Sequence, residues 1–189
     1  MPTPRIFALA AALALALASP AADASQVLHQ TLRELTLGSS DIVVGRVEST
    51  SARWNEAHTR ILTDVTVRVS ESLKGAGGGV LTLTQLGGDL DGFRLSVPGS
   101  PLFRPGEDAL LFLWRDPQGR AQVNGLGQGK FDITTDRVTG ARTLQRGLPG
   151  LRVREARSLS LVKEGEPAPR LPLDDMLGEI RAILAEGGR

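Results

Sequence analysis

The sequence contains no cysteine in its 189 residues, and this absence excludes disulfides and a lipid attached through cysteine. Small exported domains commonly use disulfides to offset a limited core, so this chain must fold on apolar burial alone. Charge of one sign is also scarce, because 22 Lys and Arg face 21 Asp and Glu, for a net charge of +1. No strong electric field therefore favours nucleic acid or an anionic membrane as a partner.

Histidine is nearly absent as well, and only His29 and His58 are present. Two distant histidines without cysteine make a poor zinc set, which would need Glu56 or Asp64 to complete it. The Gly-x-Ser-x-Gly motif of many hydrolases does not occur. We therefore expect no catalytic residue, no metal and no cofactor, and keep a metal-dependent hydrolase built from His58, Asp64 and Glu56 as an alternative.

A short segment with one positive charge, 1–5, leads directly into the apolar run 6–18. This is the outline of a secretory signal peptide, and the run is shorter than the ~20 apolar residues that cross a bilayer. Ala22-Asp23-Ala24 has the small-x-small pattern that signal peptidase reads. The sequence therefore predicts cleavage before Ser25 and export to the periplasm or the medium, with no integral membrane segment in the mature chain.

The mature chain begins with helical spacing and then changes to the spacing of strands. Leucines recur at helical intervals over 25–37, where Ser25 could cap the start and Gly38 could end the helix with a positive φ. Beyond it, apolar and polar residues alternate, which is typical of half-buried strands. The expected strands are 42–52, which ends at a turn at 53–55, and 61–70, 81–84, 93–97, 109–114 and 131–134.

These strands, with short turns between them and a helix at each end, predict a mainly β protein. We expect a small OB-like closed barrel with a short N-terminal helix and a C-terminal amphipathic helix, and a two-sheet sandwich is the alternative. The run 109–114 is apolar on both faces and should be the most buried strand. The C-terminal helix, from Asp174, carries Met176, Leu177, Ile180, Ile183 and Leu184 on one stripe and needs a surface to dock on.

The expected organisation has three parts, a signal peptide at 1–24, a barrel domain with its helix at 25–147 and a C-terminal extension at 148–189. Ordered motifs run through the barrel domain: Ser-Asp-Ile-Val-Val-Gly-Arg-Val at 40–47, Leu-Lys-Gly at 73–75, Phe-Arg-Pro-Gly-Glu at 103–107, Leu-Leu-Phe-Leu at 110–113 and Gly-Leu-Gly-Gln-Gly-Lys-Phe at 125–131.

Together these motifs resemble a family of exported bacterial proteins of unassigned function. The resemblance implies a compact β-barrel and supplies no catalytic residue. Some members of that family are encoded near matrixin-like metalloproteases, which suggests an inhibitor or chaperone of an exported protease. The OB-fold inhibitors of metalloproteases coordinate the enzyme's zinc through an N-terminal cysteine, and this chain has no cysteine.

The sequence predicts an exported, non-catalytic binding module whose partner is a protein or peptide and not a nucleic acid. Alternating glycines at 125–129 predict a strand that opposes Asn124, Leu126, Gln128 and Lys130 on its other side. Loops at 53–60, 87–92 and 98–106 should engage the partner from one end of the barrel. The candidate binding residues are Trp54, Arg104, Asn124, Gln128 and Lys130.

Overall fold

The computed structural model describes residues 26–75, 78–146, 152–154 and 171–187. The predicted signal peptide, its cleavage site before Ser25 and most of the connector before the last helix lie outside the described residues. Within the described part of the chain, no helix combines the length and the apolar character needed to cross a membrane.

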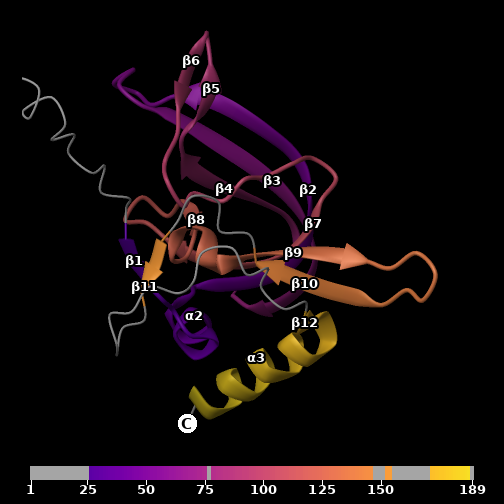
Figure 1. Ribbon diagram of the computed structural model, residues 1–189. Coiled ribbons are helices and arrows are strands. Elements are labelled where there is room, and N and C mark those ends of the chain that lie inside the picture. The colour runs from indigo at the N-terminus through magenta and orange to yellow at the C-terminus, as the bar shows by residue number, and fades with distance from the viewer. Residues whose placement is uncertain (1–25, 76–77, 147–151, 155–170, 188–189) are drawn as a thin grey trace, which may run out of the picture.

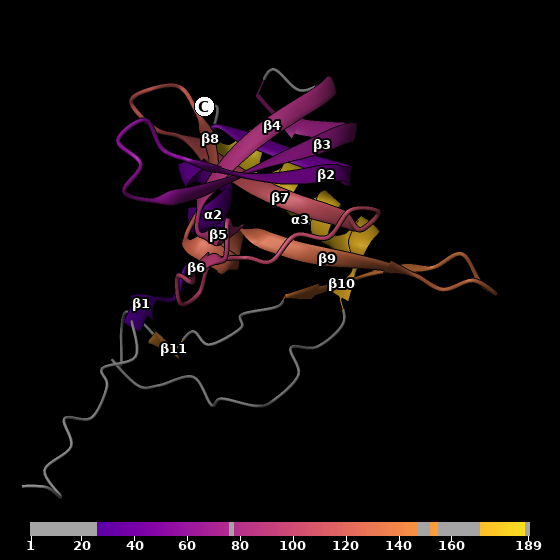
Figure 2. The ribbon, with the colours of Figure 1, turned by 90° about the horizontal axis from the view of Figure 1, so that it is seen from above.

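Five strands close into a barrel (Figures 1 and 2). They are β2 (Asp41–Trp54), β3 (Ile61–Lys74), β4 (Gly79–Leu86), β7 (Asp108–Arg115) and β8 (Ala121–Val123). The order around the barrel is β7-β2-β3-β4-β8 and back to β7, and all neighbours are antiparallel except β4 and β8. This confirms the OB-like closed barrel over the two-sheet sandwich.

A second group of strands extends the sheet beyond the barrel. β9 (Lys130–Thr135) pairs with the first half of β7, whereas β8 pairs with its last residues. β9 continues into β10 (Arg142–Arg146), which pairs with β12 (Leu171–Pro172), and the β9–β10 hairpin projects from the body in both ribbon views (Figures 1 and 2). β1 (Gln26–Leu28) pairs in parallel with β11 (Arg152–Arg154).

Two apolar cores lie on opposite faces of β2 and β7. The barrel interior holds Val43, Val47, Val65, Val67, Leu83, Ala109, Leu111, Leu113, Ala121 and Val123. The outer core, between the sheet and the two helices, holds Leu35, Ile42, Val44, Leu110, Phe112, Phe131, Leu144, Leu173, Met176, Leu177 and Ile180. Since both faces of β7 are covered, every residue from Ala109 to Leu113 is fully buried, as the two-sided apolar run predicted.

The helices α2 (Leu32–Gly38) and α3 (Leu173–Gly187) supply the cover of the outer core. The predicted apolar stripe of α3 docks on this chain's own sheet. The prediction that the first helix begins at Ser25 is wrong, because Gln26–Leu28 is a strand. The Thr31 side chain and Glu34 form a reciprocal capping box, which fixes the start at Leu32.

Three further expectations are corrected. Gly38 remains helical without a positive φ, and Ser39 caps the helix in an extended conformation. The expected strand 93–97 is only β6 (Phe93–Leu95), which pairs with β5 (Gly88–Leu90) in a hairpin outside the barrel sheet. The expected strand at 125–129 is a 3-10 turn, η1 (Leu126–Gly129), which starts from the left-handed residue Gly125.

Candidate functional site

Trp54 lies where the turn after β2 meets the β5–β6 hairpin. Its indole N–H donates to Asp91 Oδ2 at 3.0 Å. Its ring stacks on His58 with centroids 6.3 Å apart and meets Phe93 edge-on at 5.8 Å. Trp54, one of the predicted binding residues, therefore joins two loops that are distant in sequence, and its indole N–H is already hydrogen-bonded.

Gln128 and Lys130 are buried beside η1, and Asn124 is half-buried there. The Asn124 amide donates to Ser39 Oγ at 3.1 Å, and Gln128 is fully buried with its Oε1 accepting from the Gln30 backbone at 2.9 Å. Their predicted alignment along a strand does not exist, since η1 winds them around a turn.

Lys130 is buried and paired with carboxylates on both sides. Its Nζ lies 2.9 Å from Glu107 Oε1, contacts Asp132, and sits 5.0 Å from the centre of the Phe103 ring. Arg104 is exposed in the turn before β7, and its side chain has no hydrogen bond or ion pair with the described residues. The structure therefore does not bring the five predicted binding residues together.

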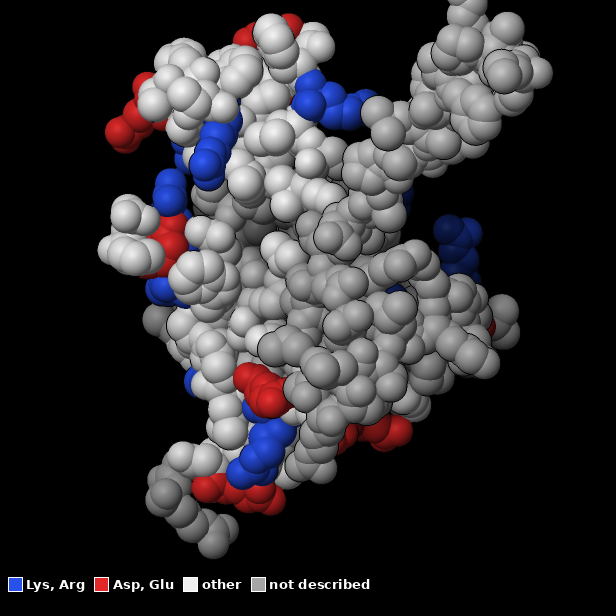
Figure 3. Space-filling model, turned by 60° about the vertical axis from the view of Figure 1, so that its left-hand side comes forward, with Lys and Arg blue, Asp and Glu red and all other residues white. Residues whose placement is uncertain are grey.

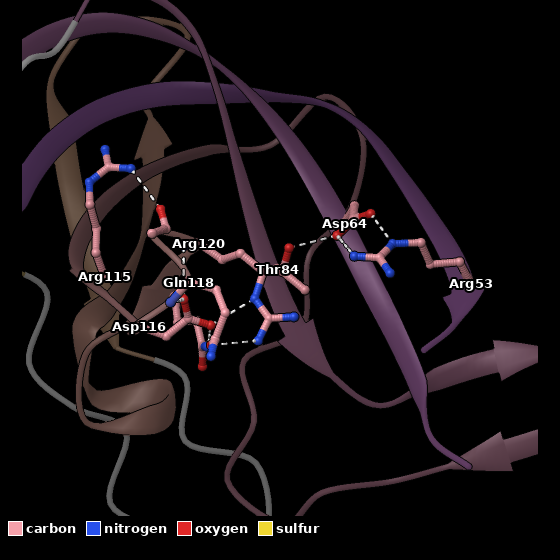
Figure 4. A network of polar contacts seen from close by, with 9 residues as sticks. Arg53, Asp64, Thr84, Arg115, Asp116, Gln118 and Arg120 are labelled. Carbon is pink, nitrogen blue, oxygen red and sulfur yellow. Dashed lines mark hydrogen bonds and ion pairs between the residues drawn. The ribbon is translucent and has the colours of Figure 1, made fainter. Parts of the chain in front are cut away.

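A different set of polar side chains meets on the outer surface of β3, β4 and β8 (Figure 4). Arg53 at the end of β2 pairs with Asp64 on β3, with Nε and Oδ2 2.6 Å apart. Thr84 on β4 donates to Asp64 Oδ1 at 2.7 Å. In the turn between β7 and β8, Asp116 accepts a hydrogen bond from Arg120 Nε at 2.7 Å. Each of the two carboxylates is therefore paired with an arginine.

These contacts set the pKa of both carboxyls. Burial would raise the pKa of Asp64, but hydrogen bonds from Arg53 and Thr84 outweigh it and leave the pKa below its usual range. Burial also opposes ionisation of Asp116, and the side chain and backbone of Arg120 again bring its pKa down. Both groups are thus ionised, hydrogen-bonded and committed to their partners.

Beside this network runs a groove of about 280 Å³ that we call the arginine groove. Two turns and three strands supply its walls: the turns between β2 and β3 and between β7 and β8, and the strands β3, β4 and β8. Its polar lining consists of Asn55, Arg60, Thr84, Gln85, Arg120 and Gln122. Hydrogen-bond donors dominate this set, and no carboxylate belongs to the lining.

A larger hollow of about 600 Å³, which we call the apolar hollow, lies between the end of β4 and the loop that leads to β7. Its apolar lining consists of Leu86, Leu95, Val97, Pro98, Pro101 and Leu102. The β5–β6 hairpin adds the ion pair of Arg94 and Asp89 to the lining, with Nε and Oδ1 2.6 Å apart. The hollow and the groove share Gln85 and Leu86, so they are continuous across the end of β4. Within the described residues, neither is lined by an aromatic ring.

The strand between them has an incomplete partner. β8 pairs with β4 only through Leu83 and Ala121, so the described part of the sheet leaves this edge of β4 unpaired on both sides of Leu83. The Oε1 atom of Gln85 is buried and has no hydrogen-bond partner among the described residues. Unpaired backbone and amide groups at a hollow favour a ligand that supplies hydrogen bonds.

Acidic and basic side chains do not form separate patches on the face of the molecule drawn in Figure 3. On the face drawn in Figure 3, blue and red side chains occupy neighbouring positions. The alternative metal-binding set does not converge either, because His58 stacks on Trp54 while Asp64 is held by Arg53. Among the described residues, no group of three or more histidine and acidic side chains is arranged to hold a metal ion.

The chain matches no family model, and a search of curated proteins finds no similar sequence. The family resemblance of residues 40–133 therefore stays a prediction. Sequence reasoning missed Arg60 and Arg120 because they come from separate turns, and the only available signal was an arginine beside each predicted hairpin turn.

Proposed function

We propose that the chain is an exported binding module that holds an extended segment of another polypeptide and acts without catalysis. The observation that carries this proposal is the junction at the end of β4, where the arginine groove and the apolar hollow meet along an unpaired strand edge. A strand edge beside a pocket can take an extended peptide by backbone hydrogen bonds, with the pocket receiving a side chain.

The chemistry of the lining supports a binding role. General acids and bases usually have pKa values near the working pH, whereas the pKa values of Asp64 and Asp116 lie below their usual range. The apolar hollow offers area for one or two large side chains, and the amides at its border offer hydrogen bonds to a peptide backbone. Export, predicted from the N-terminal sequence, would place the module among other exported proteins.

The test is a selection of short random peptides against the mature chain, followed by affinity measurements on the peptides recovered. Leu102→Glu places a charge in the apolar hollow, and Leu102 is 61% exposed, so the fold should tolerate the change. Val138→Glu is the matched control, because Val138 is 95% exposed at the tip of the β9–β10 hairpin. Both variants replace an exposed apolar side chain by glutamate.

We expect the recovered peptides to share large apolar residues. Leu102→Glu should weaken their binding by at least about tenfold, and Val138→Glu should change it by less than about twofold. Recovery of no peptide, or equal loss of affinity in the two variants, contradicts the proposed site.

A further inference from the structure

Arg60 lies at the wall of the arginine groove and has no ion-pair partner among the described residues. Its backbone N–H donates to Asn55 Oδ1 at 2.9 Å, which fixes the turn between β2 and β3. Its exposed guanidinium has no hydrogen bond or ion pair with any described residue. Because the backbone contact holds the turn, the side chain is not needed to build it.

The neighbouring carboxylates are already engaged. Asp64 accepts from Arg53 and Thr84, and Asp116 accepts from the backbone N–H groups of Gln118 and Arg120 as well as from the Arg120 guanidinium. Glu56, in the same turn as Arg60, acts electrostatically on Arg53. None of these carboxylates forms an ion pair with Arg60 among the described residues.

Arg120 is the second cation of the groove, and it is held in place. Its Nε donates to Asp116 and its Nη2 reaches Gln118 Oε1 at 3.4 Å. Its Nη1 donates to no described acceptor. A fixed guanidinium with free N–H groups is suited to bind a carboxylate, since its orientation is set before the ligand arrives.

We infer that the arginine groove binds a carboxylate of the same polypeptide segment whose apolar side chain fills the apolar hollow. This inference rests on the proposed function and adds the ligand's charge to it. The two guanidinium groups supply the main donors, because the amide nitrogens of Asn55 and Gln122 already donate to Thr59 and Asp116 and each keeps one further N–H. Leu86 and Gln85 connect the groove to the apolar lining. The carboxylate can be an acidic side chain or a chain terminus, which have the same chemistry.

A single-stranded nucleic acid is the competing anion for such a groove. OB barrels that bind single strands stack bases on aromatic rings and follow the backbone with many cations. No aromatic ring lines the groove or the hollow among the described residues, and the aromatic contact of Trp54 is with His58 and Phe93. The observations therefore favour an acidic polypeptide.

The experiment titrates the mature chain with defined probes and follows binding by backbone amide NMR. The acidic probe is acetyl-Leu-Val-Leu-Glu-Glu-amide, the terminal probe is acetyl-Leu-Val-Leu-Gln-Gln with a free carboxylate, and the neutral probe is the amide of the latter. A poly-dT oligonucleotide is the nucleic-acid probe. Arg60→Gln and Arg120→Gln remove the cations, and Arg142→Gln, whose partner Asp174 lies on α3, removes an equal charge elsewhere.

We expect the acidic or the terminal probe to bind at least about tenfold more tightly than the neutral probe, and added salt to reduce this difference. Arg60→Gln should remove most of the difference with no change in melting temperature, whereas Arg142→Gln should retain it. Whichever probe gains identifies the source of the carboxylate.

Equal affinity of the three peptides overturns the inference and leaves the proposed function intact, whereas binding of no peptide contradicts both. Tighter binding of poly-dT, lost in Arg60→Gln, assigns the groove to nucleic acid and overturns the inference. Retention of the acidic preference in Arg60→Gln and in folded Arg120→Gln also overturns it.

Discussion

The outer surface of the barrel has two regions that share strand β2 and differ in composition. We call the first the covered face, where α2 and α3 pack on Ile42, Val44, Leu110 and Phe112. We call the second the open face, on the later part of β2, the first part of β3 and β4, where no described helix packs. The end of β3 belongs to the covered side, because Glu71 pairs with Arg181 of α3. The outward residues of the open face include Ser49, Ser51, Thr66, Thr82 and Asp64.

The comparison separates stability from recognition within one continuous sheet. Large apolar side chains on the covered face exclude water and carry the burial energy of the outer core. Short hydroxyl side chains on the open face leave a strand surface accessible beside the arginine groove and the apolar hollow. We therefore expect substitutions on the two faces to differ in kind, with unfolding on one side and altered binding on the other.

The largest expected effect is on the covered face. Phe112 is fully buried and its ring packs against Phe131 with centroids 5.9 Å apart. Phe112→Ala should lower the free energy of unfolding by about 3–5 kcal/mol, because it removes a buried ring and leaves a cavity. Urea denaturation followed by far-ultraviolet circular dichroism measures this change. A loss below about 1 kcal/mol would mean that the outer core does not hold the helices to the sheet.

The next effect concerns the passage of β2 from one face to the other. Register shifts interrupt its pairing with β3 at three places, one of them between Val44 and Gly45. Such bulges bend a strand and increase its twist. A Cβ added at Gly45 would lie 2.7 Å from both the Arg68 carbonyl oxygen and Val67 Cγ1.

Gly45→Ala should therefore cost about 1–3 kcal/mol of unfolding free energy, since backbone on β3 would have to move. The control is Gly178→Ala, where an added Cβ meets nothing within 4 Å and a helix former replaces glycine. That control should stabilise the protein by up to about 1 kcal/mol. If both variants are neutral, the close approach at Gly45 does not constrain the strand.

A smaller effect tests the ion pair on the open face. The lowered pKa of Asp64 means that its contribution to stability is present above its unfolded pKa, about 4, and is lost as the pH falls through the folded pKa. Asp64→Asn should cost about 1 kcal/mol at neutral pH, allowing for partial solvent exposure of the pair. Its stability should also fall less steeply than that of the wild type below about pH 4.

Denaturation midpoints measured at several pH values check this expectation, and Arg53→Gln serves as the companion variant. Since it removes the other partner of the same pair, Arg53→Gln should reproduce most of the loss at neutral pH. If the stabilities of the wild type and Asp64→Asn fall equally steeply at acid pH, the pKa of Asp64 is not lowered by Arg53 and Thr84.

The two faces also explain which features the sequence could predict. The alternation over 61–70 and the two-sided apolar run 109–114 follow burial, so β3 and the buried centre of β7 were predicted correctly. Trp114, the last residue of that run, is exposed. The alternation at 93–97 is equally clear, but it predicts only an extended segment and does not indicate which strand pairs with it. The segment pairs with β5, a contact set by the tertiary fold.

The site was less predictable, for a related reason. Glycines at alternate positions suggested a strand at 125–129, yet positive φ values at Gly125 and Leu126 begin a 3-10 turn and carry Gln128 into the interior. Arg60 and Arg120 come together only because the barrel closes between β4 and β8. A single sequence contains no local pattern for that closure.

A substitution on β4 should change stability least, and it tests whether packing constrains the open face. Thr82 is exposed on β4 and lies opposite Thr66 on β3. Thr82→Ala should change the free energy of unfolding by less than about 0.5 kcal/mol, with a slight loss from the lower strand preference of alanine. Denaturation beside Phe112→Ala measures it on the same scale. A loss above about 1 kcal/mol would place the open face under packing constraint, and its short hydroxyl side chains would then reflect stability instead of access for a ligand.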